Sequence, residues 1–129
     1  MAFQVSSVDN HPYIIAEIGL NHNGDIDLAK STIDAAKNCG VNAVKFQSFR
    51  AKNLLKEDSD RFQIMRGLEL DEDSHYLLFE YTKSKGLDFI STAFCLESLQ
   101  MLQNIGVEAI KIASCDATNY MLIDKVIES

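Results

Sequence analysis

Four short apolar segments alternate with four segments of helical character, and this alternation limits the fold of the chain more than any other feature. The apolar segments are Tyr13–Ile18, Ala43–Phe49, Asp88–Phe94 and Ala109–Ser114. The segments of helical character are Asp27–Cys39, Asp71–Lys85, Leu96–Ile105 and Tyr120–Glu128. Strands that are joined by helices are typical of a parallel sheet, because each helix carries the chain back to the starting end of the sheet. The sequence therefore predicts an α/β fold of four βα units.

The ends of the helical segments carry recognisable signals. Gly40, Gly86 and Gly106 follow the first three of these segments, and glycine at that position commonly ends a helix. Acidic residues open Asp71–Lys85, where they suit the positive end of the helix dipole. We expect the aromatic and leucine residues of Asp71–Lys85 to lie in the core.

One long segment, Arg50–Leu70, shows neither pattern, and we expect it to be an irregular loop. Loops of this length are uncommon in compact domains and are often functional. It follows the carboxyl end of the second strand, which is the side where α/β folds place their sites.

Four βα units are compatible with a small doubly wound sheet or with half of a (β/α)8 barrel. Small or polar side chains share one face of the second and fourth strands: Ala43, Lys45 and Gln47, and Ala109, Lys111 and Ala113. Large apolar side chains share the other face: Val44 and Phe46, and Ile110 and Ile112. A doubly wound sheet is apolar on both faces, whereas a barrel has an interior that differs from its helix-covered exterior. The pattern favours the N-terminal half of a (β/α)8 TIM-type barrel.

Polar residues stand inside or next to the predicted strands. Glu17 interrupts the first apolar segment, Lys45, Gln47 and Lys111 follow on the second and fourth strands, and Thr92 is on the third. A buried carboxylate without a partner is costly, so a structural ion pair of Glu17 with Lys45 is one interpretation. Two lysines and a carboxylate in a barrel mouth also suit a dianionic ligand, such as a phosphate ester of a carboxylic acid.

Several classes of function are disfavoured. The net charge of −7 argues against nucleic-acid binding. No apolar run approaches the roughly 18 residues that span a bilayer, and three widely spaced cysteines indicate reduced thiols, so we expect a cytoplasmic protein without membrane association. No pair of His, Cys or carboxylate residues has metal-ligand spacing. Ser91, Ser114 and Cys115 have no nearby histidine to activate them as nucleophiles, so we expect no catalytic triad. We expect His11 and His75 to be structural or exposed.

Four motifs of the chain resemble the N-terminal half of the sialic acid (N-acetylneuraminate) synthase family. They are AEIGLNHNG at Ala16–Gly24, AVKFQ at Ala43–Gln47, FISTAF at Phe89–Phe94 and IKIAS at Ile110–Ser114. They occur in the order of the family, and the similarity covers nearly all of the chain from Pro12 onward. AEIGxNHxG together with KFQ is the specific part of this resemblance, whereas KIAS alone is a weak signal.

The resemblance implies a (β/α)8 barrel with a small C-terminal antifreeze-like domain and a full-length protein that is a homodimer. It also implies the condensation of phosphoenolpyruvate with N-acetylmannosamine or a related amino sugar, with release of phosphate and with a divalent metal, Mn²⁺ or Mg²⁺. Residues 1–129 would then be half of the catalytic barrel, with the metal ligands outside this chain, so we expect the chain alone to be inactive. The barrel half would also present unpaired edges on its outer strands, which favours a part of a longer synthase or a chain that pairs with another copy.

The resemblance also implies roles for individual residues. Lys45 would bind phosphoenolpyruvate, with Thr92, Lys111 and Ser114 completing the cradle and Thr92 acting partly through its backbone. Glu17 and Gln47 would lie near the sugar and the reacting carbon, with Glu17 as acid or base. The residues expected to shape the adjacent turn are Asn21, His22 and Asn23.

Two other functions remain open at this point. One is a non-catalytic half-barrel that serves as a binding or assembly module. The other is a related synthase that joins phosphoenolpyruvate to a sugar phosphate. The chain departs from the family pattern at Ala93, where many members have proline, and this change removes no functional side chain.

Overall fold

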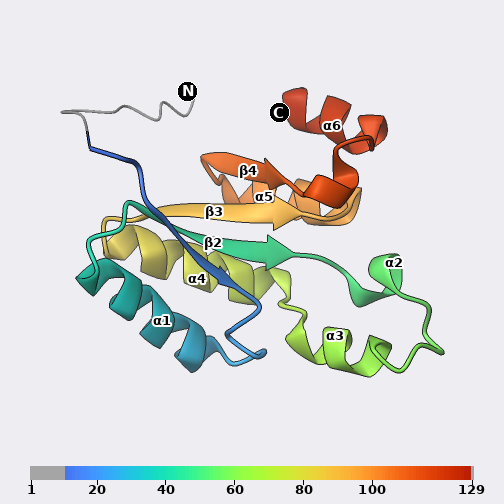
Figure 1. Ribbon diagram of the computed structural model, residues 1–129, viewed down its shortest axis with the longest axis horizontal. Coiled ribbons are helices and arrows are strands. Elements are labelled where there is room, and N and C mark those ends of the chain that lie inside the picture. Colours follow the sequence, from blue (N-terminus) through green and yellow to red (C-terminus); the bar gives the residue numbers. More distant parts are fainter. Residues whose placement is uncertain (1–10, 129) are drawn as a thin grey trace.

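The four apolar segments form four parallel strands in a single sheet. In the computed structural model, which describes residues 11–128, the strands are β1 (Ile15–Gly19), β2 (Ala43–Ser48), β3 (Asp88–Ala93) and β4 (Ala109–Ile112). They lie in the order β1-β2-β3-β4 (Figure 1). A doubly wound sheet reverses its strand order at a switch point, and this sheet does not. The predicted α/β fold of four βα units is confirmed.

A helix follows each strand where the sequence predicts one. These helices are α1 (Ile26–Asn38), α4 (Glu72–Ser84), α5 (Leu96–Ile105) and α6 (Tyr120–Ile127). Aspartate side chains cap two of them: Asp25 accepts from the backbone N–H of Leu28 at 3.1 Å, and Asp71 accepts from that of Ser74 at 2.8 Å. Within residues 11–128, no helix is both long and apolar enough to cross a membrane.

The segment Arg50–Leu70 is not an irregular loop, so that expectation was wrong. It contains two short helices, α2 (Ala51–Leu54) and α3 (Phe62–Leu68). Phe62 packs with Phe49 and Ala51 in a small second core that anchors this segment. Helices of one or two turns span too few residues to show a clear apolar period in the sequence.

Each strand has a boundary that differs from the prediction by one or two residues. The first strand begins two residues later than expected and includes Gly19. The fourth strand ends at Ile112, and Ser114 instead begins a short 3₁₀ turn, η2 (Ser114–Asp116). Apolar composition continues past the last ladder hydrogen bond in such places, so composition alone places the ends poorly.

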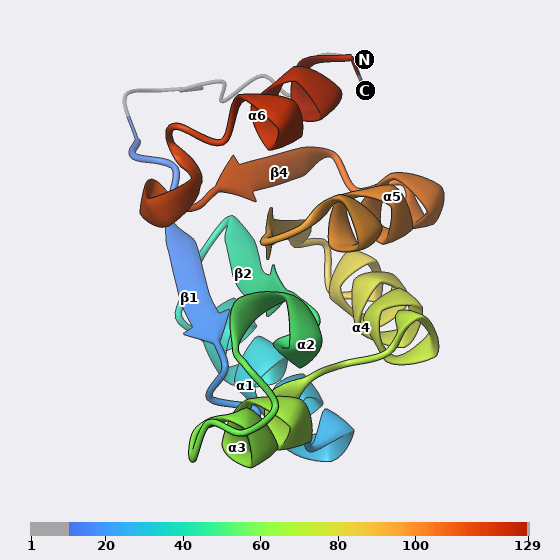
Figure 2. The ribbon, with the colours of Figure 1, turned by 90° about the vertical axis from the view of Figure 1, so that its right-hand side faces the viewer.

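The main core lies between the sheet and the helices. Figure 2 shows the strands on a curve with α1, α4 and α5 on its outer side. Val44, Phe46 and Phe89 are fully buried there, and the rings of Phe46 and Phe89 stack with centroids 5.3 Å apart. Burial of these apolar side chains supplies the main driving force for docking the helices.

Only one side of α4 joins this core. Leu78 is buried, but Tyr76 and Leu77 are 54% and 41% exposed. The expectation that all aromatic and leucine residues of this helix are core was therefore wrong. Successive residues of a helix point about 100° apart, so neighbours of Leu78 cannot all face the sheet.

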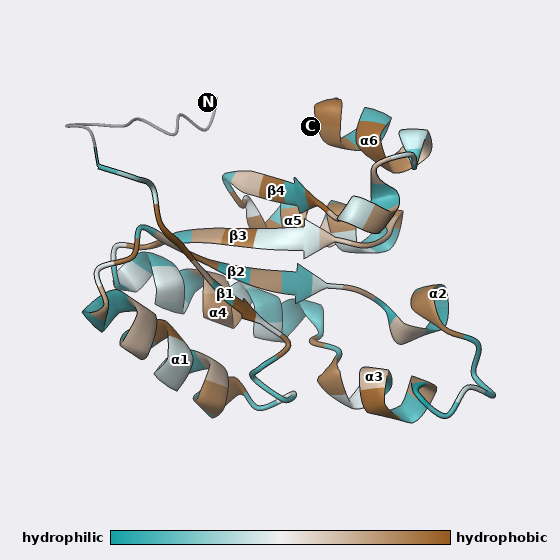
Figure 3. Ribbon diagram, viewed as in Figure 1, coloured by the Kyte–Doolittle hydropathy of each residue, from teal (hydrophilic) through white to brown (hydrophobic). Residues whose placement is uncertain are grey.

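The opposite face of the sheet is polar. Lys45 and Gln47 alternate with the fully buried Val44 and Phe46, as the sequence predicts. In Figure 3 the carboxyl end of β2 has the colour of hydrophilic residues. This face, which carries Glu17, Lys45, Gln47, Thr92 and Lys111, is called the polar face below.

Replacing Phe46 with alanine tests the assigned core. Phe46→Ala removes a fully buried ring that stacks on Phe89, so the free energy of unfolding should fall by about 3–5 kcal/mol. Urea denaturation followed by circular dichroism measures this change. Ile64→Ala, at a side chain that is 65% exposed on α3, is the control and should cost about 0.5 kcal/mol or less. Equal losses in the two variants would contradict the assigned core.

Candidate functional site

The ammonium group of Lys45 lies at the centre of the polar face. The strand register sets Glu17 directly beside Lys45, and their side chains form an ion pair through Glu17 Oε2. On the other side, Lys45 Nζ donates to the hydroxyl oxygen of Thr92 at 3.4 Å. The Lys45 side chain is 13% exposed and Thr92 is buried. Strands β1 and β3 thus hold one cation from both sides.

Glu17 is not buried, although the sequence suggests a carboxylate inside a buried strand. Its side chain is 50% exposed, and it has Lys45 as its partner. The strand that carries it is paired on one side only among the described residues, which leaves the carboxylate open to solvent. The ion pair that the sequence allows is present, and the accessible carboxylate remains free to interact with a ligand.

A second row of polar residues crosses three strands. Gln47, Thr92 and Lys111 are register partners across β2, β3 and β4. The Cα atoms of Gln47 and Lys111 are therefore about 10 Å apart, two strand spacings. The side chain of Lys111 is exposed and has no hydrogen bond or ion pair within residues 11–128. Ser114, also exposed, follows in the turn after β4.

The turn after β1 places its residues differently from the polar face. Asn21 and Asn23 are exposed, and Asn23 adopts a positive φ of 51°. The ring of His22 is fully buried on the helix-covered side, 6.1 Å from the ring of Phe46 between centroids. The structure therefore does not bring His22 together with Lys45, and its effect on a ligand would act through the shape of the turn.

The tautomer of His22 follows from its contacts. Its Nδ1 accepts from the backbone N–H of Gly24 at 3.0 Å, so the proton of the neutral ring is on Nε2. Nε2 has no hydrogen-bond partner within the described part of the chain. Burial lowers the pKa of His22, which keeps the ring neutral.

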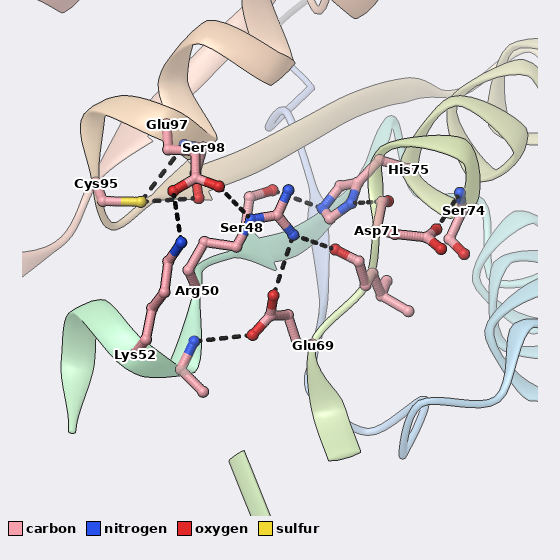
Figure 4. Close-up of polar contacts among 12 residues, drawn as sticks. Ser48, Arg50, Lys52, Glu69, Asp71, Ser74, His75, Cys95, Glu97 and Ser98 are labelled. Carbon is pink, nitrogen blue, oxygen red and sulfur yellow. Dashed lines mark hydrogen bonds and ion pairs between the residues drawn. The ribbon is translucent and has the colours of Figure 1, made fainter. Parts of the chain in front are cut away.

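Arg50, which sequence reasoning did not single out, joins the segments beside the site (Figure 4). Its guanidinium donates to Glu97 at 3.1 Å, to Glu69 at 3.2 Å and to the carbonyl oxygen of Leu70 at 3.3 Å. The second oxygen of Glu69 accepts from the backbone N–H of Ala51 at 2.9 Å. Burial opposes the charge of Arg50, but the two carboxylates outweigh it and raise the guanidinium pKa. One arginine therefore ties the start of α2, the segment between α3 and α4, and α5 together.

A buried polar chain lies on the helix-covered side of the same strands. The Oγ atoms of Ser91 and Ser48 are 2.7 Å apart, and Ser48 Oγ is 2.7 Å from His75 Nε2. His75 Nδ1 is 2.9 Å from the carbonyl oxygen of Asp71, which only accepts, so Nδ1 carries the proton and Nε2 accepts from Ser48. Ser48 lies between Ser91 and His75, so Ser91 has no direct hydrogen bond to a histidine within the described residues. Ser48, Ser91 and His75 are all buried, so this chain links β2, β3 and α4 instead of meeting a substrate.

The described residues contain no group of three His, Cys, Asp or Glu side chains placed to hold a metal ion. The polar face offers a single carboxylate, Glu17, and its nearest charged neighbour is the cation Lys45. This donor set does not fit a divalent metal, which prefers several oxygen or nitrogen ligands.

Replacing Arg50 tests its role in tying the segments together. Arg50→Met leaves Glu69 and Glu97 without their shared cation, so the free energy of unfolding should fall by about 1–3 kcal/mol and proteolysis within residues 51–69 should accelerate. The control is Lys52→Met, whose side chain is 61% exposed and meets Glu97 only at 3.7 Å. Limited proteolysis with mass spectrometry reads out both variants. Equal cleavage rates for Arg50→Met and the unmodified chain would contradict this role.

The buried His75 makes stability depend on pH. Burial lowers the pKa of His75 below 6.5, and the hydrogen bond to Asp71 opposes this only in part. Below pH 6.5 the unfolded chain binds a proton that the folded chain does not, so the free energy of unfolding should decrease as the pH falls from 7 toward 5. His75→Gln should reduce that decrease, and Leu77→Gln on the exposed side of α4 should retain it. Urea denaturation at several pH values gives the slope of the free energy of unfolding against pH. Identical slopes for the two variants would contradict the assignment of this pH dependence to His75.

Comparison with known proteins identifies the family that this chain resembles. The family model described as "NeuB family" matches residues 32–129. N,N'-diacetyllegionaminic acid synthase of Legionella pneumophila is 43% identical over 121 residues, which cover 83% of this chain and 34% of that protein. N-acetylneuraminate-9-phosphate synthase of Mus musculus is 33% identical over 129 residues, which cover 89% of this chain and 36% of that protein.

A solved structure shows the same arrangement of strands and helices. N-acetylneuraminic acid (sialic acid) synthetase of Leptospira borgpetersenii, crystallised with citrate, superposes with a TM-score of 0.88 and 35% sequence identity. The superposition covers 99% of this chain and 47% of that one. The four parallel strands thus match the N-terminal part of a TIM-barrel synthase, as the sequence predicts. The chain spans about a third of the length of the curated relatives it matches.

Proposed function

The chain belongs to the NeuB family, and on this basis we propose that its polar face is the phosphoenolpyruvate-binding wall of a nonulosonate synthase. The proposed reaction of the whole protein joins phosphoenolpyruvate to N-acetylmannosamine or a related amino sugar and releases phosphate. The observation that supports this most is the ammonium of Lys45, held between Glu17 and Thr92 on a face that no helix of the described chain covers.

Lys45 is suited to bind an anionic group of phosphoenolpyruvate. It is mostly buried, so an anion that reaches it interacts in a setting where water screens the charge less than at the surface. The contacts to Glu17 and Thr92 restrict its ammonium before the ligand arrives. A cation that is already oriented loses less conformational entropy on binding.

Lys111 provides the second cation of the proposed cradle. It lies on the same face, beside Thr92 in the register, and it has no ion-pair partner within residues 11–128. Phosphoenolpyruvate carries a phosphate and a carboxylate, so two lysines on β2 and β4, on either side of β3, can each meet one anionic group. The hydroxyls of Thr92 and Ser114 would complete the cradle.

Glu17 and Gln47 are placed for the condensation itself. Glu17 is half exposed beside Lys45, so its carboxylate can exchange a proton with a substrate next to the bound phosphoenolpyruvate. The Gln47 carboxamide, one position along the face from Lys45, offers both a donor and an acceptor to the sugar. Holding two substrates together at such a wall supplies part of the rate by proximity.

The residues of this chain do not fit the divalent metal that the family resemblance implies. The roles proposed above therefore involve only the side chains of the polar face. The amino sugar is proposed as a class, because the Legionella pneumophila and Mus musculus relatives are synthases of different products. Only Glu17 and Gln47 of this chain are proposed to contact the acceptor.

Isothermal titration calorimetry with phosphoenolpyruvate tests whether the polar face of this chain binds that ligand. Lys45→Met should weaken binding by roughly tenfold or more, the usual loss when a charge-assisted hydrogen bond is removed. The control is Lys125→Met, since Lys125 is exposed on α6 and pairs with Glu128. The control should bind like the unmodified chain. Absence of binding by the unmodified chain, or equal affinity of Lys45→Met and Lys125→Met, would argue against this function.

A further inference from the structure

Gly19, the last residue of β1, has a conformation that few other residues adopt. Its φ is +57°, in the left-handed region that favours glycine. The pairing of β1 with β2 also shifts there: Glu17 pairs with Lys45, whereas Gly19 pairs with Phe46 instead of Gln47. The resulting bulge places the backbone of Gly19 close to the side chains of the polar face.

The space beside Gly19 is already occupied by two functional groups. A Cβ atom on residue 19 would lie 3.2 Å from Glu17 Oε1 and 3.5 Å from Gln47 Nε2. The first distance is shorter than ordinary van der Waals contact, so the carboxylate would have to move by a few tenths of an ångström. Glu17 therefore stands with one oxygen over Gly19 and the other, Oε2, on Lys45.

We propose that Gly19 is a positioning residue of this site, because its missing side chain leaves the space from which the Glu17 carboxylate reaches Lys45. The same space admits the Gln47 carboxamide. A methyl group at residue 19 pushes Oε1 away, and because the carboxylate is rigid, Oε2 shifts against the Lys45 ammonium. The consequence for phosphoenolpyruvate rests on the proposed function, whereas the positioning of Glu17 does not.

The chain offers a matched control for backbone strain. Gly40, after α1, has a φ of +77°, and no heavy atom lies within 4 Å of a Cβ placed there. Alanine at either glycine incurs the cost of a left-handed conformation, about 1–2 kcal/mol. Only Gly19→Ala also crowds Glu17 and places a methyl group in contact with the Gln47 carboxamide. The difference between the two variants therefore isolates the contact with the site.

Side-chain NMR of the chain tests the positioning directly. In Gly19→Ala, the carboxyl ¹³C signal of Glu17 and the side-chain amide signals of Gln47 should move, while Gly40→Ala should leave them at their original positions. If Gly19→Ala does not fold, Gly19→Asn replaces it, since asparagine tolerates a left-handed φ and carries the same Cβ. The proposal is overturned if these signals stay in place in the residue 19 variant, or if Gly40→Ala moves them equally.

A double-mutant cycle provides an independent measurement. In a Glu17→Ala background the carboxylate is absent, so Gly19→Ala should destabilise the chain by the same amount as Gly40→Ala. In the unmodified background, Gly19→Ala should destabilise it more than Gly40→Ala. Urea denaturation gives all of these free energies. If Gly19→Ala lowers the free energy of unfolding equally in both backgrounds, Glu17 and residue 19 do not interact, and the proposal is overturned.

Phosphoenolpyruvate binding separates this proposal from the proposed function. Gly19→Ala should raise the dissociation constant by about threefold or more, because contacting groups couple to that extent, and Gly40→Ala should not raise it. If the NMR signals respond but the unmodified chain binds no phosphoenolpyruvate, the proposed function fails and the positioning stands. If the chain binds phosphoenolpyruvate but Gly19→Ala leaves both the signals and the affinity unchanged, the positioning fails and the proposed function stands.

Discussion

The alternation of side chains along four parallel strands is the constraint on which the rest of the structure depends. Val44, Phe46 and Phe89 point to the helices and form the core, so their strand neighbours necessarily point the other way. The positions that point the other way include Lys45 and Thr92, and pairing of β2 with β3 brings these two side chains within hydrogen-bond distance. The same burial that stabilises the sheet therefore assembles a polar face, and no separate element is needed to position it.

Contacts on the covered side and at the carboxyl ends of the strands fix the surroundings of that face. The hydrogen bonds from Ser91 through Ser48 to His75 attach α4 to β2 and β3. Arg50 attaches the segments that follow β2 to the start of α5 (Figure 4). Both sets of contacts begin within three residues of Gln47, so they hold the end of the strand that carries Lys45.

Sequence reasoning predicted the parts of this structure that repeat and missed those that depend on single contacts. Helix α5 (Leu96–Ile105) has the predicted bounds, and the polar face was identified from the period of two along β2 and β4. Helices α2 and α3 were missed because they are too short to show a period. Arg50 is 19 positions from Glu69 in the sequence and 47 positions from Glu97, so no local pattern reveals its contacts with these two residues. The exposure of Glu17 likewise follows from its place at the sheet edge, which its apolar neighbours in the sequence do not indicate.

The central claim is that the polar face, with Lys45 at its centre, binds phosphoenolpyruvate. Titration of phosphoenolpyruvate into ¹⁵N-labelled chain, followed by backbone amide spectra, tests it most directly. The largest saturable shifts should fall on Lys45, Thr92 and Lys111, from three adjacent strands. Shifts centred on residues 51–69, or no saturable shift at millimolar phosphoenolpyruvate, would contradict it.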